Sequence, residues 1–167
     1  ASALPVEWNL AREGQSLRLT YSIKNTSQKR FYICDKLVQG SRPNTFKSFD
    51  GLTVQNSQTP DALLFALGTT PPGVPSMWLL PVTYIALEPG QTHTGSRIVS
   101  LPLKPFNAHG LEKPLSPKAD KAHFLVYAFE GEPPKWRDLP GDDGKPIRVP
   151  EGQSMSMLRG SPLPIPK

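Results

Sequence analysis

The stretch Leu17–Lys24 reads LRLTYSIK and has the most regular pattern in the chain. Apolar and polar residues alternate along it without a break, and a period of two predicts a strand with one buried face. Turn residues follow at Asn25–Gln28, and a second strand is expected over Lys29–Val38. The two strands should therefore form a long hairpin.

Proline is unusually frequent, with 20 residues in a chain of 167, where average usage of roughly 5% would give fewer than half as many. Since proline is excluded from helix interiors and central strands, the chain should consist of short strands joined by loops. Lys121–Glu130, KAHFLVYAFE, is apolar on both faces and is expected to be a central strand. We predict an all-β fold, an immunoglobulin-like antiparallel β-sandwich of about seven to nine short strands with long proline-rich loops. It should form one domain over residues 1–167, with a proline-rich tail at about 160–167.

The segment Leu87–Gln91, LEPGQ, precedes a predicted long strand over Thr92–Leu103. It resembles the L-x-P-G turn of bacterial immunoglobulin-like domains, and the hairpin with its Asn-Thr-Ser turn is similar to their second and third strands. The resemblance implies an architecture and carries over no functional residues.

The net charge of the chain and its N-terminal sequence indicate which partners and which cellular location to expect. The net charge is +5, but the basic residues are dispersed and only Lys29 and Arg30 are adjacent, so we expect no nucleic-acid partner. The sequence begins at Ala1 without methionine, which suggests a mature periplasmic or extracellular domain with a signal or lipid anchor upstream. The longest apolar run, Ala62–Leu67, is far below the roughly 18 residues of a membrane helix, so no transmembrane segment is expected in this chain.

Residues with metal-binding or nucleophilic chemistry are few. The three histidines are widely spaced, and the aspartates of DLPGDDG (138–144) do not follow the calcium-loop spacing, so no metal or cofactor is expected. The single cysteine, Cys34, lies in a predicted strand and is expected to be buried and inert. No catalytic motif is present, which makes an enzyme the weakest hypothesis.

Three predicted loops are longer than roughly 12 residues, a length usually associated with function. They are Thr69–Pro81, Phe106–Ala119 and Gly131–Gly152. The first and third contain the candidate binding residues Met77, Trp78, Lys135, Trp136 and Arg137. Tryptophan and arginine often anchor interfaces, and methionine adapts to irregular partners. Trp78 could instead pack over the open end of the sandwich.

The leading hypothesis is a non-enzymatic protein-binding domain of the bacterial cell envelope, of the inhibitor, immunity or accessory type. Its partner would be another protein, such as a secreted effector or hydrolase, recognised through the long loops. A carbohydrate- or cell-wall-binding module with exposed tryptophans as stacking platforms is the alternative. A small hydrolase with an unrecognised site is the third possibility.

Overall fold

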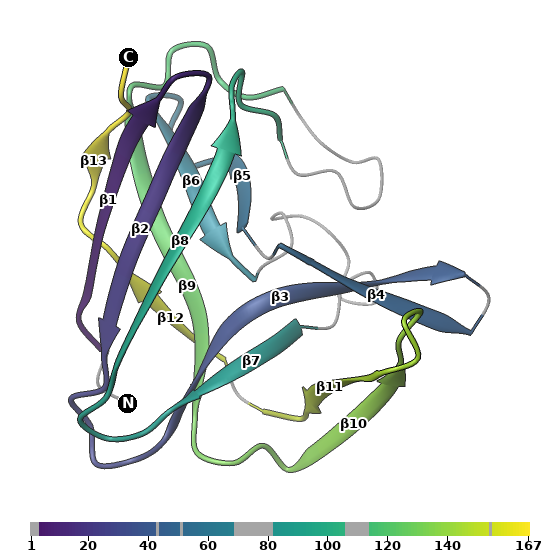
Figure 1. The fold of residues 1–167 in the computed structure, drawn as a ribbon. Coiled ribbons are helices and arrows are strands. Elements are labelled where there is room, and N and C mark those ends of the chain that lie inside the picture. Colours follow the sequence, from purple (N-terminus) through teal and green to yellow (C-terminus); the bar gives the residue numbers. More distant parts are fainter. Residues whose placement is uncertain (1–3, 43, 51, 69–81, 106–113, 154) are drawn as a thin grey trace.

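The computed structural model describes residues 4–42, 44–50, 52–68, 82–105, 114–153 and 155–167. It is all-β, with thirteen strands in these residues and no helix (Figure 1). The strands are β1 (Val6–Glu13), β2 (Ser16–Lys24), β3 (Phe31–Arg42), β4 (Thr45–Asp50), β5 (Leu52–Asn56), β6 (Ala62–Leu67), β7 (Val82–Leu87), β8 (Thr92–Ser100), β9 (Lys121–Glu130), β10 (Lys135–Pro140), β11 (Pro146–Glu151), β12 (Ser156–Arg159) and β13 (Leu163–Pro164). The predicted fold class is confirmed, whereas the expected number of strands was too low, because several predicted loops form short strands.

The first sheet has the order β1-β2-β8, and all its pairs are antiparallel. The alternation that predicted β2 matches its burial, since every second residue from Leu17 to Ile23 is buried. Tyr21 lies opposite Gly95 of β8, where an added Cβ would stand 2.4 Å from the tyrosine ring. Glycine at this position therefore leaves room for the ring.

The second sheet is built around β9, as its apolar sequence predicted. One edge of β9 pairs with β6 and then β3, and the other pairs with β12 and β13. The β6–β9 pair is parallel, which departs from the predicted purely antiparallel arrangement. Beyond these strands, β5 pairs with β6, while β4 and β7 pair with β3. The predicted tail contributes β13, so part of it belongs to the sheet.

The main core lies between the two sheets. Leu17 and Leu19 from the first sheet and Phe65 from the second belong to one buried cluster. The ring of Trp8 stacks on Phe124 at 5.2 Å across this interface. Packing of two facing β-sheets over a shared apolar layer defines a β-sandwich. The immunoglobulin-like assignment within that class stays a prediction.

A second region extends from the sandwich. The far half of β3 continues with β4 away from the first sheet, and the β10–β11 hairpin lies beside them (Figure 1). A separate small core of Val38, Leu139 and Val149 joins the hairpin to β3. The residues of Gly131–Gly152 were predicted to form a loop, which is wrong, because most of them form this hairpin. In the part of the chain that the structure describes, no helix has the length and apolarity needed to cross a membrane.

Candidate functional site

The β10–β11 hairpin is closed by a compact turn. Gly141 donates its N–H to the carbonyl of Lys145 (3.1 Å), and the N–H of Lys145 bonds to Oδ1 of Asp143 (2.9 Å). Gly144 has a φ of 83°, a conformation that suits glycine. Of the aspartates that were considered and rejected as a calcium loop, Asp143 thus shapes this turn, whereas Asp138 lies on β10.

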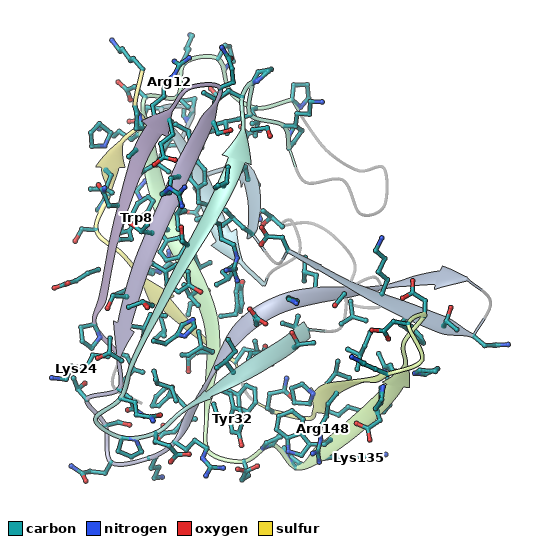
Figure 2. All side chains as sticks on the ribbon, in the orientation of Figure 1. Trp8, Arg12, Lys24, Tyr32, Lys135 and Arg148 are labelled. Atoms are coloured by element: carbon teal, nitrogen blue, oxygen red, sulfur yellow. The ribbon has the colours of Figure 1, made fainter. Side chains whose placement is uncertain are left out.

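The hairpin places the three predicted binding residues of this segment on β10. Lys135 and Arg137 both pair with Glu151 on β11, at 3.9 Å and 3.0 Å. Trp136 lies between them in sequence and therefore faces the other side of the strand. There the guanidinium of Arg148 lies 5.1 Å from the centroid of its ring. Figure 2 shows Arg148 and Lys135 on the hairpin and Tyr32 on the neighbouring sheet.

Tyr32 connects Trp136 to the sandwich. The two rings meet edge to face, with centroids 5.4 Å apart, and Tyr32 stacks on Phe129 of β9 at 4.9 Å. The tyrosine hydroxyl donates to Oε1 of Glu132 at 2.5 Å, and Arg30 donates to the same oxygen at 2.6 Å. Aromatic contacts of this kind fix the position of a ring more strongly than area burial alone. Trp136 is therefore held in place before any partner binds.

The charges around Tyr32 shift two pKa values. The hydrogen bond from Tyr32 holds the pKa of Glu132 below its usual value, and that from Arg30 acts in the same direction. Burial raises the pKa of Tyr32, as does its bond to the glutamate. Glu132 is therefore ionised and Tyr32 protonated at neutral pH. We call Arg30, Glu132, Trp136 and Arg148, together with the buried Tyr32, the hairpin surface.

The guanidinium of Arg148 is available to bind a group on another molecule. In the described part of the chain it forms no ion pair, although Asp138 lies opposite it in the hairpin register. The side chain is exposed, and a guanidinium presents five N–H donors. Stacking on Trp136 orients these donors while leaving them accessible, which suits a carboxylate or carbonyl on another molecule.

A second polar cluster lies where the sandwich meets the β3–β4 region. Arg97 of β8 pairs with Asp35 at 3.2 Å and with Asp50 at 3.1 Å. Asp35 falls in a β-bulge, since the register with β7 shifts between Cys34 and Lys36. A bulge inserts an extra residue and re-aims its side chain. This cluster joins three strands and serves to hold the β3–β4 region against the first sheet.

The pKa values of the titratable groups near this cluster are shifted in directions that do not favour a reactive nucleophile. Burial lowers the pKa of His93, whose Nε2 lies 3.2 Å from the hydroxyl of Tyr21. Burial also raises the pKa of Tyr21 to about 12. The Cys34 thiol is fully buried, and burial raises its pKa well above the usual value, so the expectation of a buried thiol is confirmed. A protonated thiol is a poor nucleophile.

The outer face of the first sheet carries a shallow hollow of about 670 Å³. Its side chains from the solvent-facing positions of the three strands are Glu7, Asn9, Thr20, Ser22, Thr94 and Ser96. Among the described residues, only Ser96 of this set has a hydrogen bond to another side chain, from Arg18 at 3.1 Å. The face is therefore rich in hydroxyl and amide groups that are free to bind a polar ligand.

The structure places Lys135, Trp136 and Arg137 on β10, with Trp136 on one face and the two cations on the other, while Met77 and Trp78 lie outside the described residues. Sequence reasoning missed Tyr32 and Arg148. The alternation of apolar and polar residues in PIRVP (146–150), after the Asp-Asp-Gly turn, could have predicted the strand that carries Arg148. The two prolines in this segment argued against a strand. Within the described ranges, no group of three or more His, Cys, Asp or Glu side chains could hold a metal ion.

Fold and sites together define an all-β sandwich with an attached hairpin that presents an aromatic and cationic surface. Comparison with family models, curated proteins and solved structures gave no match.

Proposed function

We propose that this chain is a non-enzymatic protein-binding domain of the bacterial cell envelope, of the inhibitor, immunity or accessory type. It would recognise a partner protein, such as a secreted effector or hydrolase, through the hairpin surface. The observation that carries the proposal is the position of Trp136, fixed by Tyr32 on one side and covered by the unpaired Arg148 on the other. Tryptophan, tyrosine and arginine are the residues most enriched among interface hot spots.

The charges of this surface describe the partner. Arg148 is available for a carboxylate, whereas Lys135 and Arg137 lie on the other face of β10 and are already paired with Glu151. The chain carries a net charge of +5, so acidic proteins are attracted over a distance of about a Debye length. An acidic partner that places a carboxylate beside Trp136 fits both features.

The test is affinity capture from an envelope extract of the encoding organism, followed by calorimetric titration with the captured protein. Arg148→Ala should weaken binding at least tenfold at an unchanged melting temperature, because this side chain is exposed. Arg159→Ala on β12 is the matched control, since it removes one exposed arginine from a strand that pairs with β9 and not with the hairpin, and it should leave binding unchanged. Equal binding by the wild type and both variants would remove the hairpin surface from the interface.

The second candidate is a carbohydrate- or cell-wall-binding module, and the hollow on the first sheet supports it. Its hydroxyl and amide side chains match the donors and acceptors of a neutral polysaccharide. The stacking tryptophans of that hypothesis find less support, because Trp8 packs on Phe124 and Trp136 is covered by Arg148. Co-sedimentation with insoluble cell-wall polysaccharide that is lost in Asn9→Ala and kept in Arg148→Ala would favour this candidate.

A further inference from the structure

β8 is an edge strand whose backbone hydrogen bonds can be assigned from its ends. Leu101 donates its N–H to Gln15 at 2.8 Å, and Asn25 donates to the carbonyl of Gln91 at 2.9 Å. Between these two bonds the β2–β8 register runs without a shift. Because the N–H and C=O groups of successive residues point to opposite sides of an antiparallel strand, the odd-numbered residues of β8 bond to β2. The even-numbered residues point their groups away from it.

The free edge of β8 is long and regular. The backbone N–H and C=O groups of Thr92, Thr94, Ser96, Ile98 and Ser100 point to this edge, and among the described residues β8 pairs with β2 alone. The carbonyl of Ser96 accepts a hydrogen bond from Nη1 of Arg97 at 3.3 Å and keeps a second lone pair for a further donor. Proteins usually protect such an edge with proline, lysine, a bulge or a covering segment. β8 contains no proline, lysine or bulge. Its one inward-pointing charge, Arg97, is neutralised by two aspartates.

The opposite edge of the same sheet differs. The indole of Trp8 on β1 donates to the carbonyl of Ser161 at 2.6 Å. A Cβ added to Gly160 would stand 2.4 Å from the same ring, so the C-terminal segment lies directly against it. The C-terminal segment therefore covers Trp8 on this side, whereas β8 has no comparable cover among the described residues.

We propose that two copies of this chain pair antiparallel through β8, with a twofold axis at Ser96, and so join their first sheets into one continuous sheet. Ser96 then lies opposite Ser96 of the partner copy. Thr94 lies opposite the partner's Ile98, and Thr92 lies opposite the partner's Ser100. In this register every backbone group at the free edge obtains a hydrogen bond. The interface is isologous, as in most closed dimers.

The side chains favour a second copy as the occupant, because β8 is complementary to itself about Ser96. On the outer face, hydroxyl meets hydroxyl, and Ile98, which is 57% exposed, meets the methyl group of threonine. On the inner face, Arg97 lies opposite the partner's Gly95, which has no side chain, and His93 lies opposite the partner's Val99. No two like charges lie directly opposite each other, which would oppose pairing. Arg97 and the partner's Arg97 are diagonal neighbours across the axis, and each is paired with two aspartates.

Sedimentation equilibrium over a range of protein concentrations tests the dimer. We expect a reversible monomer–dimer equilibrium that salt strengthens, because each copy carries a net charge of +5. Ile98→Pro should weaken it about tenfold or more, since it removes an edge N–H from each copy without touching the β2–β8 bonds. Ser96→Lys should also weaken it by placing two charges at the axis. Arg12→Pro is the matched control, because the same alternation turns its N–H to the outer edge of β1.

Cross-linking tests the register. Ser96→Cys should form an intermolecular disulfide, because directly opposed residues have Cα atoms about 5.5 Å apart. Thr94→Cys should not, since its partner thiol would lie four residues away, about 13 Å along the strand. Cys34 is fully buried and does not interfere.

Three results would overturn the proposal. One is a chain that stays monomeric at every concentration. This result overturns the proposal both if the edge amides of β8 exchange freely with solvent and if another segment of the chain protects them. Another is a dimer unaffected by both Ile98→Pro and Ser96→Lys. The third is equal cross-linking of Thr94→Cys and Ser96→Cys.

Discussion

The sandwich and the hairpin region are built from the same kind of strands but rest on cores of very different size. In the described residues, eighteen buried side chains form the cluster between the two sheets, whereas the hairpin is joined to β3 by a cluster of three. Free energy of folding scales with buried apolar area, so the sandwich should carry the global stability. The hairpin should open locally at lower free energy. The proposed binding surface thus lies on the less stable region.

Polar and aromatic contacts hold the hairpin region in place in addition to its small apolar core. Trp136 packs on Tyr32, and Arg97 holds β3 and β4 against the first sheet. Such contacts fix geometry at a modest gain in stability, which suits a surface that must be positioned and also accessible. The following substitutions test how far the two regions are separate.

The largest effect is expected for Phe124→Ala in the sandwich. Phe124 is 2% exposed and contacts both Trp8 and Tyr21. Its truncation should cost about 3–5 kcal/mol of unfolding free energy, from lost burial and the cavity left behind. Urea denaturation followed by circular dichroism measures the loss. Phe46→Ala is the control in the hairpin region, where the ring is only partly buried, and a loss equal to that of Phe124→Ala would contradict the comparison.

Leu139→Ala should have a smaller and more local effect. Leu139 is one of three buried residues in the small core, and its truncation should cost the hairpin about 2 kcal/mol, the lower end for buried leucine. We expect faster amide hydrogen exchange in β10 and β11, with little change in β2 and β9. Leu19→Ala, a buried leucine of the sandwich, is the matched control and should speed exchange in both regions. Uniform acceleration by Leu139→Ala would show that the two regions unfold together.

The two regions also differ in how well the sequence predicts them. Leu17–Lys24 and Lys121–Glu130 were predicted as strands, because alternation and continuous apolar character are local signals. The β10–β11 hairpin was missed since Pro140 and Pro146 frame its turn and read as breakers. Prolines are tolerated at the ends of a two-stranded ribbon, where few ladder bonds are required of them.

The candidate site depends on contacts that no local pattern encodes. Trp136 was predicted from its residue type, but its edge contact with Tyr32 joins residues more than a hundred positions apart. The parallel pairing of β6 with β9 also joins segments that are remote in sequence, from Ala62 opposite Lys121 to Leu67 opposite Val126. The pairing of Arg97 with Asp35 also depends on a β-bulge that no pattern in the sequence predicts.

The smallest effect is expected for Arg97→Met, which removes the ion pairs that link β8 to β3 and β4. The arginine side chain is 20% exposed and lies between two aspartates, so its loss leaves two carboxylates close together without a cation. We expect a loss of about 1 kcal/mol in unfolding free energy, because partial exposure and solvent screening limit the contribution of the ion pairs. The loss should be smaller at high salt, which screens the repulsion between the aspartates.

The control for Arg97→Met is Arg18→Met, which removes an arginine side chain that is more exposed than that of Arg97. Arg18 lies on the same sheet and pairs with Glu13 at 2.9 Å, but its side chain is 39% exposed. Its removal should cost less than about 0.5 kcal/mol. Only Arg97→Met should also speed amide exchange in β4, because Asp50 at the end of that strand loses its partner. If both variants change stability and exchange equally, Arg97 contributes as an ordinary surface charge, and the hairpin region is held by its small apolar core and by the contact of Trp136 with Tyr32.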